Sequence, residues 1–351
     1  MTDSIAPEDP QEKPVTVEEE SPVPADGRKR AKVKRHCGRF WWIYTIIFIV
    51  VVLVVVLPIV YVAYPHKAQS AINKSTLLVT SQALLNPAPD HFDLDLNSIF
   101  LSNSSLHAKL DPFLADLCLE DSEIPFAQLS IPAIEAANGT HEHVSQTVQI
   151  KNKDQFYDYA RTQLASEEYT VYLKGKGGLK YGGLPKTTVK YNDKIVLKGL
   201  NGLEGFNVTD FNLIMTAHPD NYNSNGTVLI PNPSVTTYEM GNMTMDMYVG
   251  NVSIGNSTLE NVVLRPGNNS IPLLALTNQT AVGLLLFTNY KSGIFPIEIV
   301  NRGVVSNGQH LPYYEQPLQA KNLTVKLNVI DVLERAGLAQ ALGINTTSSA
   351  R

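Results

Sequence analysis

Residues of the types that carry out chemistry are sparse in this sequence, and the first group to consider is His141, Glu142 and His143. An extended chain places the two imidazoles on one face. Two ligands without a third do not define a zinc site, and the sequence contains no HExxH motif. We therefore interpret the tripeptide as part of a polar loop and expect neither a metal nor a cofactor.

Two glycine-containing segments resemble catalytic motifs at first glance. GNVSIG, residues 250–255, gives Ser253 the spacing GxxSxG rather than the GxSxG of a nucleophile elbow. GKGGLKYGG, residues 175–183, lacks the Ser or Thr that follows the lysine of a phosphate-binding loop. We reject both motifs and interpret the second segment as a flexible hairpin or bulge.

Paired carboxylates, which a glycosidase requires, are present as Asp93 with Asp95 and as Glu167 with Glu168. Without support from a fold, such pairs are most often solvated surface groups. The sequence contains no catalytic constellation, and we predict that the protein is not an enzyme.

Four apolar residues, Met243, Met245, Met247 and Val249, alternate with other residues. Thioethers are soft ligands that suit copper. The strict period of two instead favours a β-strand whose methionines face the core, and residues 92–96 alternate in the same way.

Asparagine indicates the compartment. No Asn precedes Asn73, and twelve Asn-x-Ser/Thr sites follow from there on, too many to attribute to chance. We predict that everything after the apolar segment described next enters the secretory lumen and is N-glycosylated. The predicted sites are Asn73, Asn103, Asn138, Asn207, Asn225, Asn242, Asn251, Asn256, Asn268, Asn278, Asn322 and Asn345.

The element that must position all of these residues is the apolar segment from Phe40 to Tyr64. It holds 25 residues without a charged side chain, long enough as a helix to span a bilayer core of roughly 30 Å. We predict one transmembrane helix that serves as an uncleaved signal anchor. Pro58 is expected at most to kink it.

The flanks of this helix predict its orientation. A basic run from Arg28 to Arg39 precedes it without an acidic residue, so the positive-inside rule places the N-terminus in the cytosol. The run is expected to bind anionic lipid headgroups. Residues 1–39 are predicted to be a disordered tail because the acidic, Pro-rich part before the run cannot bury enough apolar surface to offset the entropy of ordering.

Composition and cysteine usage bound the remaining possibilities. The formal net charge of −5 argues against nucleic acid as a partner. The two cysteines, Cys37 and Cys118, lie before and after the apolar segment, so no disulfide can form within the part that follows it. Cys37, at the membrane boundary, is a possible palmitoylation site, an unmodified thiol being the open alternative. Cys118 is expected to be a small buried residue.

The part after the helix is predicted to be mainly β. At Asn207, Asn242, Asn251 and Asn322 the middle residue of the glycosylation site is apolar, which predicts strands with an outward, glycosylated face and an inward core residue. These middle residues are Val208, Met243, Val252 and Leu323.

A weak internal repeat supports two modules. Residues 146–175 and 269–303 each predict a strand, a short helix and a strand, with Asp154 as the N-cap of the first helix and an inward stripe of Phe156, Tyr159, Ala160 and Leu164. We expect two tandem antiparallel β-sandwich domains with short helices, at residues 65–200 and 201–330. A C-terminal helix and tail should cover residues 331–351.

Three segments together resemble a known family. They are IPFAQLSIPAIEAANGT, KYNDKIVLKGLNGLEGF and GTVLIPNPSVTTYEMGNMTMDMYVGNVSIGNSTLENVVLRPGNNSIPL. They are similar to a fungal family of single-pass membrane proteins defined by a domain of unknown function (DUF3712), with LEA-type-2-like domains as in NDR1/HIN1-like proteins. The resemblance covers roughly residues 66–330. It implies a pair of lumenal sandwiches and favours the vacuolar membrane over the plasma membrane, and it supplies no catalytic residues.

Three functional hypotheses follow. The first is a non-enzymatic membrane glycoprotein whose lumenal or extracellular sandwiches bind a membrane-protein partner. The second is lipid binding or transfer between the sheets of a sandwich, which an apolar cavity of several hundred Å³ would favour. The third is a lumenal or cell-wall hydrolase, which requires a cleft with two convergent carboxylates.

Overall fold

The computed structural model describes residues 27–103, 108–120, 122–216 and 220–344, with side chains from Trp41 onward. The acidic, Pro-rich part of the predicted tail, residues 1–26, lies outside these residues. The chain divides into two compact units, Met1–Ile59 and Val60–Arg351. We call the second the β-rich unit.

The apolar segment is helical. α1 (Gly27–Pro58) begins before the predicted Phe40 and includes the backbone of the basic run. Pro58 has no N–H to donate to the preceding turn, and the chain continues as a π-helical turn, η1 (Ile59–Ala63), and then α2 (Tyr64–Ile72). Within the described residues, one helix is long and apolar enough to cross a membrane, and its most apolar window is not buried against other parts of the chain.

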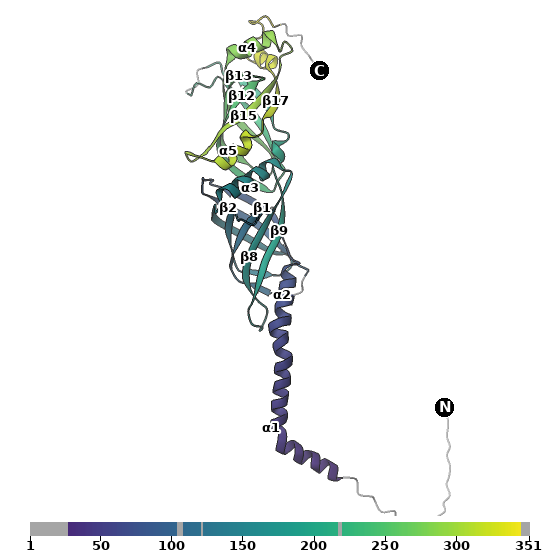
Figure 1. Ribbon diagram of the computed structural model, residues 1–351. Coiled ribbons are helices and arrows are strands. Elements are labelled where there is room, and N and C mark those ends of the chain that lie inside the picture. Colours follow the sequence, from purple (N-terminus) through teal and green to yellow (C-terminus); the bar gives the residue numbers. More distant parts are fainter. Residues whose placement is uncertain (1–26, 104–107, 121, 217–219, 345–351) are drawn as a thin grey trace, which may run out of the picture. The chain divides into compact units, whose positions relative to one another are not determined.

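The first half of the β-rich unit, residues 65–200, packs two sheets face to face (Figure 1). One contains β1 (Thr76–Leu85), β2 (His91–Leu101) and β7 (Thr140–Gln149), which are antiparallel neighbours. The other has the order β5-β4-β8-β3-β6, with β9 on β8. Its strands are β3 (Ala108–Leu110), β4 (Phe113–Leu119), β5 (Ala127–Ile131), β6 (Ile134–Ala136), β8 (Glu168–Lys180) and β9 (Thr187–Lys198).

The second half, residues 201–344, contains seven strands that surround an interior. Their order is β10-β11-β14-β13-β12-β15-β17, and β17 is in contact with β10. The bounds are β10 (Asn207–Leu213), β11 (Ser224–Asn232), β12 (Thr236–Val249), β13 (Val252–Leu264), β14 (Gly267–Thr277), β15 (Ile294–Ser306) and β17 (Leu323–Asn328), with the short β16 (Gln309–His310) beside β15. The helices are η2 (Asn201–Leu203), α4 (Gln279–Thr288), α5 (Pro312–Gln319) and α6 (Val329–Arg335).

One strand joins the two halves. The beginning of β12 pairs in parallel with β1, and its later part pairs antiparallel with β15. Gly241 lies between these two parts with φ at 77°, and a Cβ there would collide with the carbonyl oxygen of Val305. The predicted boundary between residues 200 and 201 falls at η2, yet a single sheet continues across both halves.

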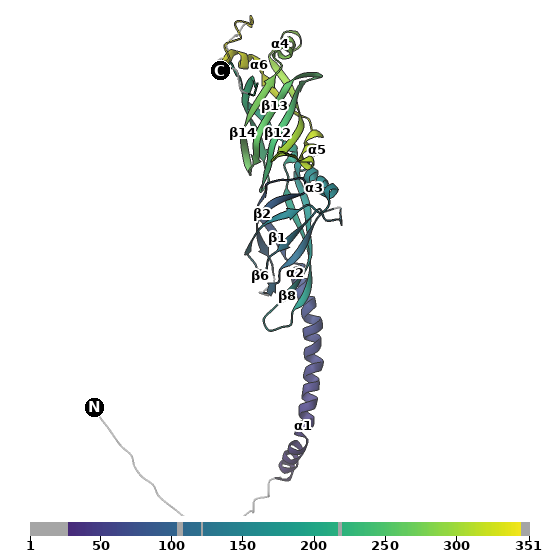
Figure 2. The ribbon, with the colours of Figure 1, turned by 90° about the vertical axis from the view of Figure 1, so that its left-hand side faces the viewer.

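Helices α3 (Lys153–Ala165) and α5 lie side by side where the halves meet (Figure 2). Phe156 on α3 stacks on Phe92 of β2 at 5.5 Å and meets Tyr313 of α5 edge-on at 4.9 Å between ring centroids. The buried apolar residues of both halves form one continuous core.

The predicted strand and helix patterns hold except at Asp154 and Val252. Both repeats fold as strand, helix and strand, and the predicted inward rows on β2, α3 and β12 are buried. The N-cap of α3 is Asn152, whose side chain accepts a hydrogen bond from the Gln155 N–H, while Asp154 lies in the first turn. Val252, predicted to face inward, is 40% exposed because it directly follows the turn between β12 and β13.

Candidate ligand-binding site

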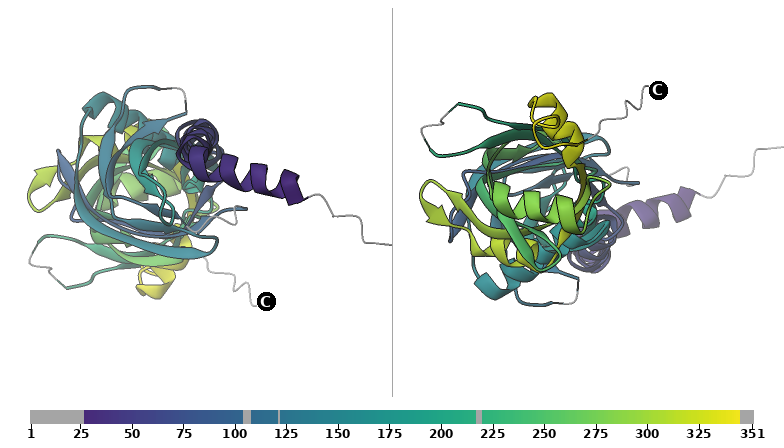
Figure 3. Two further views of the ribbon diagram at one scale, coloured as in Figure 1. Left: turned by 90° about the horizontal axis from the view of Figure 1, so that it is seen from below. Right: turned by 90° about the horizontal axis from the view of Figure 1, so that it is seen from above.

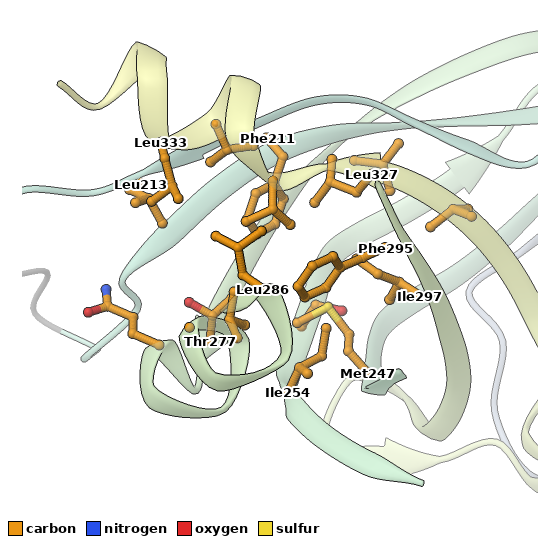
Figure 4. Close-up of a pocket in the computed structure, with 18 of the residues that line it drawn as sticks. Phe211, Leu213, Met247, Ile254, Thr277, Leu286, Phe295, Ile297, Leu327 and Leu333 are labelled. Atoms are coloured by element: carbon orange, nitrogen blue, oxygen red, sulfur yellow. The ribbon is translucent and has the colours of Figure 1, made fainter. Parts of the chain in front are cut away.

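The second half of the β-rich unit contains a partly open, apolar cavity of about 310 Å³. Every strand of the seven-stranded arrangement contributes to its wall, as do α4 and α6. Figure 4 shows Phe211, Met247, Leu286 and Phe295 among the side chains that surround it. Ser257, Thr277 and Gln279 are the polar side chains in the wall, and none of the described lining residues is charged.

The alternation of two neighbouring strands explains why the wall is apolar. Met245 and Met247 are the inward residues of β12, and Phe295, Ile297 and Ile299 are those of β15. Side chains two residues apart on a strand face the same side, so the two rows form one continuous apolar surface. Methionine is flexible and polarisable, so it fills irregular apolar space.

Helix α4 crosses the end of the strands of the second half in the view from above (Figure 3), and it contributes to the wall of the cavity. Asn278 caps it by accepting a hydrogen bond from the Ala281 N–H at 3.1 Å. The helix is apolar on every side: Leu286 faces the cavity, whereas Leu284 is 65% exposed and Phe287, which also lines the cavity, is 52% exposed.

Gly283 is the point at which α4 leaves room in the cavity. It lines the wall, and a Cβ built there meets no atom within 4 Å. Glycine in a helix interior costs up to about 1 kcal/mol relative to alanine. At this position it keeps volume free in the cavity.

Helix α6 closes the side between β17 and β10. Asn328 caps α6 by accepting a hydrogen bond from the Ile330 N–H, and Arg335 donates one to the carbonyl oxygen of Phe211 at 2.6 Å. The arginine thus joins α6 to β10. β10 lies beside β17, but the two strands form no hydrogen-bonded pair among the described strands. Val332 and Leu333 of α6 point into the cavity.

A second cavity, also of about 310 Å³, adjoins the first and shares Phe206, Met245 and Ile299 with it. It lies toward α3, η2 and α5. Arg161 and Lys321 are the charged residues in its described lining, and both are exposed. Asn301 is its uncharged polar residue.

The first half is packed much more tightly. The cavity between its two sheets measures about 70 Å³. At its junction with the second half, Gln163 donates hydrogen bonds to the hydroxyls of Tyr159 and Tyr169 at 2.9 and 3.0 Å. Burial raises the pKa of both tyrosines, so they stay neutral phenols and serve the core rather than proton transfer.

Of the residues first considered for chemistry, the structure brings His143 and Asp95 together. His143 lies on β7 rather than in a loop, and its Nε2 lies 3.0 Å from Oδ2 of Asp95 on β2. Among the described residues, no three His, Cys, Asp or Glu side chains lie close enough together to hold a metal ion. Cys118 is buried on β4, as predicted, and burial raises the pKa of its thiol, which disfavours the reactive thiolate. The glycine-rich segment forms the end of β8 and the turn toward β9.

Eleven of the twelve predicted glycosylation sites lie in the described residues, Asn345 being outside them. Ten of the eleven asparagines are exposed, and Asn256 on β13 is partly buried. The side chains of Cys37 and of the run from Arg28 to Arg39 lie outside the description. Glycosylation, palmitoylation and binding of anionic headgroups therefore stay predictions.

Sequence reasoning missed the cavities and Asn301. A cavity is volume that no side chain fills, and a one-dimensional pattern does not record it. The available signal was the inward row of β15, in which an asparagine follows Phe295, Ile297 and Ile299 at the same period of two.

Comparisons with known proteins identify one matching family model. A family model described as a protein of unknown function (DUF3712) matches residues 124–247, which span parts of both halves. No curated protein matches. Among solved structures, the CupB6 tip adhesin from Pseudomonas aeruginosa is 6% identical with a TM-score of 0.18, covering 72% of this chain and 98% of its own. The periplasmic chaperone SfaE is 11% identical with a TM-score of 0.15, at the same coverages.

Proposed function

We propose that the second half of the β-rich unit binds a long-chain apolar ligand, which is the second of the three functions predicted above. The observation that carries this proposal is the cavity of about 310 Å³ whose wall contains no charged side chain among the described residues. Ligand pockets in proteins measure about 300–1,000 Å³ and are lined mainly by apolar side chains. A core that served stability alone would be filled to close packing, as the first half is.

The hydrolase hypothesis has no counterpart in these walls. It requires two convergent carboxylates in a cleft. Neither large cavity has an aspartate or glutamate in its described lining. The protein we propose is a binding protein rather than an enzyme.

A membrane-protein partner, the first of the predicted functions, has one supporting observation. Leu284 and Phe287 expose apolar surface on α4, and Phe287 also lines the cavity. Exposed apolar side chains that gather at one place mark interaction sites. A partner bound there would control access to the ligand.

We further propose the finer features that the sequence predicts. The protein is a single-pass membrane glycoprotein with a cytosolic N-terminus and a lumenal or extracellular β-rich unit, related to the fungal LEA-type-2-like proteins and resident at the vacuolar membrane. Endoglycosidase digestion and protease protection of a tagged N-terminus test this topology. An unglycosylated product with a protected N-terminal tag would contradict it.

Gly283 provides the sharpest test of ligand binding. The substitution Gly283→Phe places a ring in the cavity while raising helix propensity, so we expect it to abolish binding without loss of thermal stability. The full-length protein in lipid nanodiscs is incubated with hexadecane and examined by native mass spectrometry for the bound alkane. Leu284→Phe, on the exposed side of the same helix, is the matched control and should bind as the wild type does.

Two results would contradict the proposal. One is that the wild-type protein retains no alkane at any concentration up to its solubility. The other is that Gly283→Phe retains as much alkane as Leu284→Phe, which would locate binding outside this cavity.

A further inference from the structure

Asn301 is a buried polar residue in an apolar row. It is 7% exposed, and it follows Phe295, Ile297 and Ile299 on the inward face of β15. A leucine or isoleucine at this position would continue the pattern. The asparagine therefore requires a separate explanation.

Neither polar atom of its side chain forms a hydrogen bond within the described part of the chain. Both Nδ2 and Oδ1 are buried there. Buried amides in proteins nearly always have partners, because an unpaired group loses its hydrogen bonds to water without replacement. The described residues thus leave both the donor and the acceptor of this amide unsatisfied.

Asn301 lies in the wall of a cavity. The residue lines the second cavity of about 310 Å³, next to Met243, Met245 and Leu259. That cavity shares Ile299 with the ligand cavity described above, and Ile299 is the next inward residue before Asn301. A chain lying along β15 from the first cavity into the second would therefore bring its end toward Asn301.

The backbone changes register directly after Asn301. Met245 of β12 is opposite Asn301, whereas the preceding Thr244 is opposite Gly303, so Arg302 has no opposite residue. Such a bulge bends a strand and changes the direction of neighbouring side chains. Here it ends the regular row of β15 at the asparagine.

The two unpaired atoms define the chemistry of the missing group. Nδ2–H needs an acceptor and Oδ1 needs a donor, so one group that both donates and accepts satisfies them together. A hydroxyl does so. An ether or ester oxygen only accepts, and an ionised carboxylate accepts while carrying a charge into an apolar wall.

We propose that the ligand of this protein is a lipid with a free hydroxyl, its hydrocarbon part in the first cavity and its hydroxyl on the amide of Asn301. This rests on the proposed function, since it assigns the polar end of the same ligand. Arg161 and Lys321 lie at the exposed side of the second cavity, with their charges in water. The amide of Asn301 recognises the uncharged group from within.

Three probes of equal chain length test this inference on the full-length protein in nanodiscs. Hexadecane has no polar group, hexadecyl methyl ether only accepts, and 1-hexadecanol donates and accepts. Native mass spectrometry of competing mixtures gives the ratio in which they are bound. We expect the wild type to prefer the alcohol over the ether by at least about tenfold, because a site built around a hydrogen bond discriminates against the analogue that lacks it.

Variants assign the preference to Asn301. Asn301→Leu should bind all three probes in nearly equal ratio and still retain hexadecane. Ser306→Ala, at a buried polar residue of β15 that lines neither cavity, is the matched control and should keep the preference for the alcohol. Thermal unfolding shows whether each variant is folded. The comparison of the three probes on the wild-type protein does not depend on any variant.

The outcomes separate the two proposals. Equal binding of all three probes by the wild type, or a preference for the alcohol that persists in Asn301→Leu, overturns the role of Asn301 and leaves apolar ligand binding intact. Failure of the wild type to bind any probe overturns both.

Discussion

The hydroxyl of Tyr313 on α5 donates a hydrogen bond to the carbonyl oxygen of Ala88, 225 residues earlier in the chain, at 3.2 Å. Ala88 lies in the turn before β2, whereas α5 follows β15. The contact is buried, and it connects the first half of the β-rich unit with the second. Together with the pairing of β1 and β12, it makes the two halves depend on each other.

Removing this hydroxyl tests that dependence. Tyr313→Phe keeps the ring contact with Phe156 and leaves the Ala88 carbonyl without its donor, so we expect a loss of about 1 kcal/mol in the free energy of unfolding. Chemical denaturation followed by far-UV circular dichroism measures it. Tyr157→Phe, on the neighbouring α3, is the control and should change stability little. Equal effects in the two variants would contradict the importance of the contact.

The buried carboxyl of Asp193 on β9 should make the stability of the folded protein depend on pH. Asp193 is 7% exposed, and burial raises the pKa of its carboxyl, although the Leu77 N–H at 2.6 Å partly opposes this. The folded state then binds the proton more tightly than the unfolded chain. Its contribution to stability is most favourable below the ordinary pKa of 3.8 and declines as the pH rises through the raised value.

Asp193→Asn should remove this decline. The amide oxygen can still accept from the Leu77 N–H, and no charge is buried at neutral pH. We expect a higher melting temperature than that of the wild type at pH 7 and a difference that shrinks toward pH 4. A difference that stays constant with pH would show that Asp193 is not the responsible group.

We expect the side chain of Gln69 to hold α2 against the first half of the β-rich unit. Its side-chain amide donates to the Lys190 carbonyl at 2.7 Å and accepts from the Lys190 N–H at 2.8 Å, as a neighbouring strand would. Gln69→Ala should lose about 1–2 kcal/mol of local stability and speed hydrogen exchange at Lys190. Lys67→Ala, at an exposed position of the same helix, is the control. Unchanged exchange at Lys190 would mean that other contacts hold α2.

The partial burial of Asn256 leads us to expect that the predicted glycosylation sites are not equally occupied. Asn256 is partly buried within β13, whereas Asn251 is exposed beside the turn that precedes the strand. A transferase needs access to the side-chain amide, so we expect Asn256 to be the least occupied of the eleven described sites. Site-resolved mass spectrometry of the protein purified from the secretory pathway measures the occupancy of each site. Full occupancy at Asn256 would indicate that its site is modified before β13 folds.

The sequence predicts the local strands and helices well because the periodic spacing of their apolar residues is evident within a few positions. Met243, Met245 and Met247 face the core of β12 as their alternation indicates, and Phe156 and Tyr159 face inward on α3. Val252 shows the limit, since the same alternation places it inward although the turn before it leaves it exposed. Asn152 rather than Asp154 caps α3 because both are suitable side chains and only the backbone conformation decides.

The long-range features could not be read in this way. The pairing of Gln82 with Thr236 joins residues far apart in sequence, and no pattern within either strand specifies its partner. The candidate site is less predictable still. Asn301 could equally mark the end of a strand, and only the structure shows that neither atom of its amide forms a hydrogen bond with a described residue.

The parallel pairing of β1 with β12 has a consequence for synthesis. β1 forms near the start of the β-rich unit, and the segment of β12 that completes its edge is made about 150 residues later. At 5–20 residues per second, that edge is without its partner for about 10–30 s. An unpaired strand edge invites pairing with other chains, so a nascent molecule is exposed to such pairing during that interval.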